Sequence, residues 1–172
     1  MFTCVPVDYA VRCCKDLLEN DPSLPSRTPF EPQDLCHLLE FCMTNTYFVF
    51  NGQFYKQRFG TAMGASVSVV CANIALEALE NSALCSYKTA PKFFVRYVDD
   101  CFCVMHRQDI MPFLEHLNSF VPSIQFTMEQ ENNGEIAFLD ASSDGLPKDL
   151  QLVCIGSRLT RVDTRVSTRH IL

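Results

Sequence analysis

The sequence lacks several features that mark common protein classes. It has no CxxC pair, no internal repeat and no low-complexity linker, and no run looks long and apolar enough to span a membrane. Its first residues, MFTCVPVDYAV, lack the charged start and continuous apolar stretch of a signal peptide. The net charge is −6, so bulk charge does not indicate nucleic-acid binding. These absences favour an intracellular protein of the nucleus or cytoplasm, without a membrane partner.

What is present predicts one globular domain with a core. Hydrophobic residues make up 48% of the 172 positions, which is enough for a buried interior. The cysteines lie inside apolar periodic segments, and without a CxxC pair a zinc site has no natural nucleus. We therefore expect buried, reduced cysteines, including Cys36, Cys42, Cys71, Cys101 and Cys103.

The N-terminal half predicts two helices and a hairpin. Asp8 is a candidate N-cap for a short amphipathic helix, and a proline-rich loop follows it. Pro32 suits the first turn of a second helix. The expected buried stripe of that helix is Leu35, Leu38, Leu39 and Cys42. TYFVFNGQFYKQRF predicts two aromatic strands joined at Asn51-Gly52.

The second half predicts an α+β unit. Helical spacing runs from Ser66 to about residue 84, and KFFVRYVDDCFCVM then gives strand, acidic break and strand. Asp109 would cap another helix, and a second hairpin would turn at Asn133-Gly134. With one strand in front, this order becomes the βαββαβ unit of a ferredoxin-like sheet, so the first strand is missing from the pattern.

Asp99 and Asp100 interrupt an otherwise apolar run that reads as strand. Because Phe93, Phe94, Val98, Phe102 and Val104 flank the pair, we expect this strand to be largely buried. Burying two adjacent carboxylates is costly unless something compensates them. A solvated turn is one explanation, since aspartate is common in turns. The other is divalent cations: Mg²⁺ prefers oxygen ligands, and two such ions can activate a hydroxyl and stabilise a leaving pyrophosphate.

The segment before the acidic pair makes the second explanation stronger. QRFGTAMGASVSVVCANI followed by RYVDD resembles the palm of reverse transcriptases. The chain is most similar to those of Penelope-like retroelements, relatives of telomerase, and the likeness extends over residues 1–150. It implies an RNA-directed DNA polymerase with Mg²⁺, or Mn²⁺ in its place. Its partners would be an RNA template, a DNA primer and deoxynucleoside triphosphates, and no protein partner is indicated.

The resemblance also implies roles for individual residues. Asp99 and Asp100 would hold the catalytic ions, and Tyr97 would support the acidic tip near the primer terminus. Asn73 falls in the helix behind the nucleotide-binding turn. The residues that would line the nucleotide and template are Phe2, as a steric gate against the ribose 2′-hydroxyl, Gln57, Gly60, Met63 and Gly64.

The chain departs from the family pattern in three places. Ala65, Ser66 and Val69 replace the family's Ser-Pro pair and a further proline. The family also carries a third catalytic aspartate on the first palm strand, ahead of the position of Met1. We therefore expect a palm truncated at both ends, lacking fingers and thumb, and inactive as it stands.

Residues 151–172 form a divergent tail. The family continues with Tyr-Arg-Lys-Pro-Thr-His-Thr, whereas this chain has CIGSRLTRVDTRVSTRHIL. Codons for the family segment read one nucleotide out of frame can give Ile-Gly-Ser-Arg-Leu-Thr-Arg, so we expect a frameshifted tail from about Cys154 with no partner in the fold. The alternative is a genuine basic tail.

Two other functions remain open. A non-catalytic ferredoxin-like module that binds RNA would need a basic, aromatic sheet face. A nucleotide cyclase or another palm-type metalloenzyme would share the acidic pair but would not need GTAMG or ANI.

Overall fold

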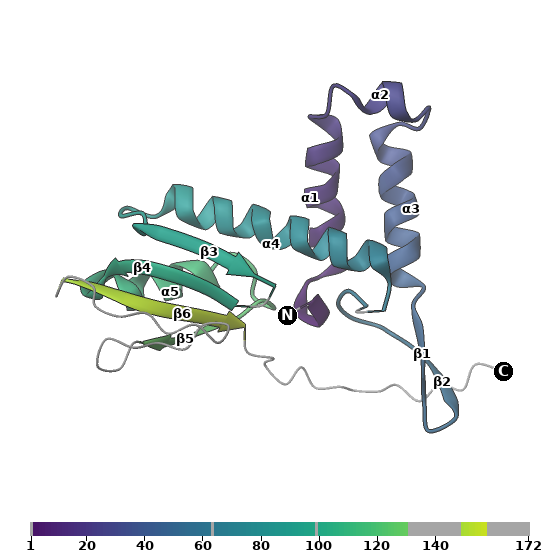
Figure 1. The fold of residues 1–172 in the computed structure, drawn as a ribbon. Coiled ribbons are helices and arrows are strands. Elements are labelled where there is room, and N and C mark those ends of the chain that lie inside the picture. The colour runs from purple at the N-terminus through teal and green to yellow at the C-terminus, as the bar shows by residue number, and fades with distance from the viewer. Residues whose placement is uncertain (1, 63, 99, 131–148, 158–172) are drawn as a thin grey trace. The chain divides into compact units, whose positions relative to one another are not determined.

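The computed structural model describes residues 2–62, 64–98, 100–130 and 149–157 of an α+β protein (Figure 1). The chain forms two compact units, which divide between Ala78 and Leu79, inside the helix α4 (Ser66–Ser86). We call them the N-terminal unit and the C-terminal unit. The sequence predicted a single domain over this region.

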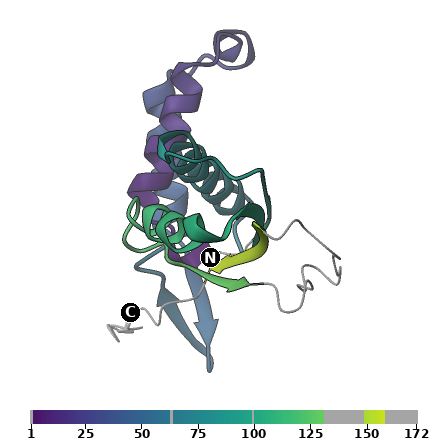
Figure 2. The ribbon, with the colours of Figure 1, turned by 90° about the vertical axis from the view of Figure 1, so that its left-hand side faces the viewer.

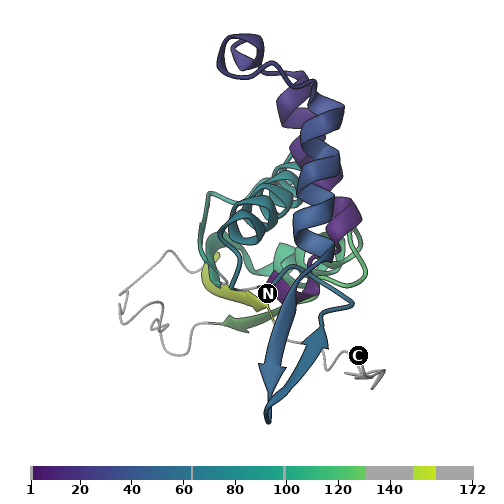
Figure 3. The same cartoon turned by 90° about the vertical axis from the view of Figure 1, so that its right-hand side faces the viewer.

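The N-terminal unit is built from helices and one hairpin. In chain order its elements before α4 are η1 (Phe2–Cys4), α1 (Val7–Glu19), α2 (Leu24–Arg27), α3 (Pro32–Thr44), β1 (Tyr47–Phe50) and β2 (Gln53–Lys56). Helices α1 and α3 pack side by side, as Figures 1 and 3 show. The β1–β2 hairpin is as predicted: Asn51 and Gly52 both have positive φ, at 50° and 77°, as the favoured two-residue turn requires.

Two details of these helices differ from the predictions. Helix α1 begins at Val7, with Pro6 at its N-cap, so Asp8 lies in the first turn, where its charge favours the helix dipole. In α3 the buried residues are Cys36 and Met43, whereas Leu38 and Cys42 are exposed. The true stripe is rotated from the predicted one because α3 buries the face that meets α1. All ten cysteines are free thiols, and the buried ones are Cys4, Cys13, Cys14, Cys36, Cys71, Cys101 and Cys103.

Helix α4 is more apolar than the sequence reading allowed. By length and composition it could cross a membrane, so the expectation that no run is long and apolar enough is wrong. The described helix is also a core element: 44% of its most apolar window is buried, and Ala75, Leu76 and Leu79 are fully enclosed. A core helix passes the same test of length and composition.

The C-terminal unit contains a four-stranded antiparallel sheet. Its elements after α4 are β3 (Phe93–Tyr97), β4 (Asp100–His106), η2 (Arg107–Asp109), α5 (Ile110–Asn118), β5 (Phe126–Gln130) and β6 (Leu150–Ser157). The strand order is β3-β4-β6-β5, with the strands labelled in Figure 1, and Figure 2 shows β6 (yellow) beside β5 (green). From Ser66 the order is helix, strand, turn, strand, helix, strand, as predicted. The expected turn at Asn133-Gly134 lies outside the described residues.

The two faces of this sheet differ. Cys101, Cys103 and Met105 of β4 point to the same face as Val153 and Ile155 of β6, and all five are buried. The opposite face is open: Phe93, Val95 and Tyr97 of β3 are 41–59% exposed. The prediction that β3 is largely buried is therefore wrong for this face.

Strand β6 corrects the prediction for the tail. It pairs with β4 on one side and β5 on the other, and Ile155 is only 1% exposed. The expectation that the chain from Cys154 has no partner is therefore wrong for Cys154–Ser157, which form the end of an interior strand. The boundary drawn after residue 150 falls inside this strand. Residues 158–172 lie outside the described part of the chain.

Candidate functional site

The acidic tip is a two-residue connection between β3 and β4. Tyr97 pairs with Asp100 across the ladder, so Val98 and Asp99 join the strands. Asp99 lies outside the described residues. Val98 has φ 53°, in the left-handed region that a β-branched side chain rarely adopts. Its side chain is 49% exposed, so core packing does not explain this conformation.

A nearly buried ion pair lies next to the Val98 turn and is hydrogen-bonded to it. Arg96 Nε of β3 lies 2.5 Å from Glu80 Oε1 of α4, with side-chain exposures of 14% and 9%. The same guanidinium donates a hydrogen bond from Nη1 to the carbonyl of Val98 at 3.4 Å. Arg96 therefore links the helix to the strained turn. Sequence reasoning missed this pair, although Glu77 and Glu80 in the apolar stretch of α4 and an arginine in an apolar strand were visible signals.

Glu80 also affects the neighbouring thiol. Cys101 Sγ donates to Glu80 Oε1 at 3.9 Å. Burial raises the pKa of Cys101, and the negative charge of Glu80 raises it further. Cys101 is therefore a neutral core residue directly behind the acidic tip.

Asp100 lies on the open face of the sheet beside a glycine. Its Cα partner in β6 is Gly156, and a Cβ built on Gly156 would lie 3.2 Å from Asp100 Oδ1. A larger residue there would press on the carboxylate. Burial raises the pKa of Cys154, with further contributions from Asp100 and Glu129, because these groups share the same face. Sequence reasoning missed Gly156, since the segment was assigned to a frameshifted tail.

A carboxylate such as that of Asp100 is the type of ligand that a hard cation prefers. The described residues at the tip, however, supply too few ligands to hold one. Asp100 offers a half-buried carboxylate with no side chain on the Gly156 side. Within residues 2–62, 64–98, 100–130 and 149–157, no group of three His, Cys, Asp or Glu side chains could hold a metal ion. A two-ion site would need Asp99 and at least one further ligand.

The predicted nucleotide-lining residues lie in the N-terminal unit. Gly60 has φ 73°, and a Cβ on it would lie only 1.8 Å from the carbonyl oxygen of Thr3. Glycine is therefore required at this position for the turn to pack against η1, the segment that begins at Phe2. The structure thus brings two separately predicted segments, Phe2–Cys4 and the Gly60 turn, into contact.

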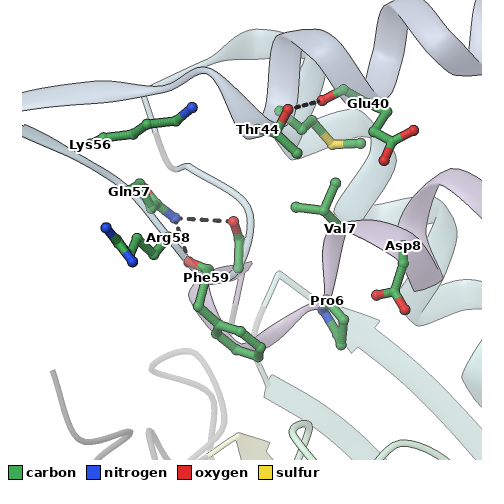
Figure 4. A pocket seen from close by; sticks show the side chains of 11 residues that line it. Pro6, Val7, Asp8, Glu40, Thr44, Lys56, Gln57, Arg58 and Phe59 are labelled. Carbon is green, nitrogen blue, oxygen red and sulfur yellow. Dashed lines mark hydrogen bonds between the residues drawn. The ribbon is translucent and has the colours of Figure 1, made fainter. Parts of the chain in front are cut away.

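Gln57 stabilises the same turn. Its side-chain amide donates to the carbonyl oxygens of Phe59 at 2.9 Å and Gly60 at 3.1 Å (Figure 4). These donors are used within the fold, so a contact of Gln57 with a nucleotide would have to go through its amide oxygen.

Gly64 differs from Gly60. A Cβ on Gly64 would meet nothing within 4 Å, so the described fold does not require glycine there. Met63, next to it, lies outside the described residues. Asn73 lies in the helix α4, as predicted, and is half-buried.

A cavity of about 630 Å³ lies beside the Gly60 turn. Gln57, Arg58 and Gly60 line one side of it, and Asp8 and Glu40 line another (Figure 4). Its lining therefore mixes positive and negative side chains. Tyr97 and Asp100 belong to the C-terminal unit.

Comparison of the chain with protein-family models, curated proteins and solved structures gives no match.

Proposed function

We propose that this chain is the palm portion of an RNA-directed DNA polymerase, similar to the reverse transcriptases of Penelope-like retroelements. The observation that carries the proposal is the strained backbone of Val98, which directly precedes the acidic pair in the connection from β3 to β4, a strand with one buried face. Backbone strain of this kind costs roughly 1–3 kcal/mol and clusters at functional sites. A solvated surface turn would have no reason to retain it.

The sheet order supports the palm interpretation. In a βαββαβ sheet the first strand lies between the third and the fourth and is antiparallel to both. Strand β6 has this position and direction, between β4 and β5. In the described part of the chain, β6 therefore takes the place that the first strand of such a sheet would have. Gly156, which carries no carboxylate, then lies beside Asp100.

Asp99 and Asp100 would hold Mg²⁺, with Mn²⁺ as a substitute. When bound, such ions activate a primer 3′-hydroxyl and stabilise the pyrophosphate that leaves from a deoxynucleoside triphosphate. Tyr97, 59% exposed on the same face, would support the primer terminus. Arg96 would keep the tip in place through its contacts with Glu80 and Val98. The Gly60 turn would shape the nucleotide pocket, and Phe2 would select against ribonucleotides, as the resemblance implies.

We expect this chain to be inactive in polymerisation as it stands. Two-metal catalysis depends on a carboxylate that bridges both ions, and the position beside Asp100 is occupied by Gly156. Losing a supporting partner of a metal ligand already costs about 10–100-fold, and losing a bridging ligand costs more.

The metal site can be tested without activity. Titration with Mn²⁺ should broaden the NMR resonances of Tyr97 to Cys101 before any others, and Asp99→Asn or Asp100→Asn should abolish the effect. Asp149→Asn is the matched control, because Asp149 is an exposed aspartate that pairs with His106 at the opposite end of β4. Broadening centred on Asp140 and Asp144, outside the described residues, would contradict the assignment.

Primer extension on an RNA template tests the expected inactivity. Extension by the unmodified chain that Asp99→Asn abolishes would show a working polymerase and overturn that expectation. Extension that survives the substitution would identify a contaminating enzyme.

The open sheet face gives the RNA-binding alternative partial support. Phe93, Val95 and Tyr97 offer aromatic and apolar surface. The acidic side chains on the same face are Asp100, which pairs with Tyr97, and Glu129 on the far edge strand β5, however, and both would repel a phosphate backbone. The polymerase palm accounts for these carboxylates, whereas a basic aromatic binding face does not.

A further inference from the structure

The β1–β2 hairpin exposes nearly all of its large side chains. Exposed fractions are 57% for Tyr47, 68% for Phe50 and 77% for Phe54, and Phe48 and Val49 are exposed as well. In Figures 1 and 3 the hairpin extends away from the end of α3, and within the described residues of its unit no helix or strand lies over it. An isolated two-stranded hairpin is marginally stable, and exposed apolar patches commonly mark binding sites. We therefore expect the hairpin to bind a partner.

The exposed surface is aromatic on both faces. On one face Phe48 and Tyr55 stack with ring centroids 5.5 Å apart, and Phe50 contacts Tyr55 edge-on at 6.4 Å. On the other face Phe54 lies opposite Val49, and the Lys56 ammonium lies 5.9 Å from the ring of Tyr47. The hairpin contains no leucine, isoleucine or methionine. It thus offers flat rings rather than the mixed aliphatic surface of a domain core.

The hairpin segment itself carries only positive charge, while Asp8 and Glu40 line the same cavity as Lys56 and Arg58. The segment from Thr46 to Gly60 contains Lys56 and Arg58 and no Asp or Glu, in a chain whose net charge is −6. Arg58 is exposed, and the Lys56 ammonium donates to the neutral Asn45 Oδ1 at 3.0 Å. This charge is complementary to a polyanion. An apolar protein partner would account for the rings but not for the local excess of cations.

We infer that the β1–β2 hairpin is a binding surface for single-stranded nucleic acid. Exposed bases stack on Phe54, and Lys56, on the same face of the hairpin, and Arg58 lie close to the phosphates. Rings and cations together are the features of single-strand-binding surfaces, where stacking tolerates any base. A duplex is excluded from this mode because its bases already stack on each other. The inference goes beyond the proposed catalysis, since binding needs neither Asp99, Asp100 nor a metal ion.

The test is fluorescence anisotropy of the full chain with a labelled oligoadenylate of about 12 nucleotides, within the range of known site sizes, in the presence of EDTA. Phe54→Ala should weaken binding by roughly 5- to 150-fold, the loss expected for one stacked base. Phe54→Leu should weaken it by a similar factor, because it keeps the apolar area but removes the ring, and Phe54→Trp should retain binding. Phe41→Ala is the matched control, since Phe41 is a phenylalanine of α3 that is 66% exposed. It should have no effect.

Salt dependence tests the role of the cations. Two phosphate contacts predict a slope of log affinity against log salt of about −1.4, and Arg58→Gln should reduce it to about −0.7. Circular dichroism and melting of each variant verify that it is folded, as expected for substitutions at exposed positions.

Three results would overturn the inference. These are unchanged affinity in Phe54→Ala, equal binding of an RNA duplex of the same length, and self-association of the chain that Phe54→Leu preserves. The last would identify a second copy as the occupant. Because the assay contains EDTA, its failure leaves the metal-site proposal untouched, and the loss of the Mn²⁺ site would leave this inference untouched.

Discussion

Asp100 and Gly156 lie directly opposite each other on β4 and β6, and no side chain separates the carboxylate from the β6 backbone. This pairing places the acidic tip next to a segment that sequence analysis assigned to a frameshifted tail. It also identifies the position from which a further metal ligand could reach the tip.

Gly156→Asp should therefore strengthen Mn²⁺ binding. Without metal, two carboxylates directly opposite each other destabilise the sheet by up to about 1 kcal/mol. With Mn²⁺ the added ligand should tighten binding about tenfold or more. Calorimetric titration measures the affinity, and Gly156→Asn is the control of the same shape without the charge. Equal affinities for the two variants would contradict the proposed geometry of the tip.

Val98→Asn should stabilise the protein. Asparagine tolerates the left-handed conformation, whereas a β-branched residue there costs roughly 1–2 kcal/mol, so a gain of about 1 kcal/mol is expected. Val95→Asn is the control: Val95 is an exposed valine in the extended part of the same hairpin. Its replacement should cost about 0.5–1 kcal/mol, because asparagine is disfavoured in strands. Urea denaturation distinguishes the signs, and losses in both variants would show that the turn is unstrained.

The pair of Arg96 and Glu80 should behave as one unit. Arg96→Met leaves the carboxylate of Glu80 nearly buried without its partner, which should cost about 3–5 kcal/mol. The double variant Arg96→Met with Glu80→Leu should cost less than this single change, since no unpaired charge remains. A double-mutant cycle in urea measures the coupling. Additive losses would mean that the two side chains act independently.

Gly60 and Gly64 should respond differently to the same substitution. Gly60→Ala should cost about 3 kcal/mol or more, because the new Cβ would overlap the backbone of Thr3 and the positive φ disfavours alanine. Gly64→Ala should change stability by no more than about 0.5 kcal/mol, since the space around it is open. Thermal melting of both variants tests this, and similar losses would show that the Gly64 site is constrained by the fold.

The buried thiol of Cys103 should make stability fall at alkaline pH. Burial, with a smaller contribution from Cys154, raises the pKa of Cys103 to about 12 in the folded protein. In the unfolded chain a thiol ionises near pH 8.5, so its stabilising contribution is complete below about 8.5 and is lost as pH rises towards about 12. The expected slope is about 1.4 kcal/mol per pH unit from this group. Above about pH 8.5 the urea midpoint of Cys103→Ala should fall less steeply with pH than that of the unmodified protein. Equal slopes in the two proteins would show that Cys103 does not cause the loss of stability.

The sequence by itself determined the local elements. Asn51-Gly52 specified the first hairpin because its turn needs two residues that accept positive φ, and both have it. The order of elements from α4 to β5 followed from periodicity and turn residues, which depend on neighbours within a few positions. The acidic pair was also visible in the sequence as an interruption of an apolar run, although the strain at Val98 was not.

Only the tertiary structure decided which distant segments meet. Leu150–Ser157 becomes an interior strand because it pairs on both sides with strands far from it in sequence, a choice for which no local signal exists. The buried face of α3 is set by its contact with α1, since a helix with several apolar residues allows more than one stripe. The same holds for Glu80 with Arg96 and for Gly60 with Thr3: each contact forms because packing brings the two backbones together. Local sequence specifies which conformation a segment prefers, whereas burial and long-range pairing are properties of the whole chain.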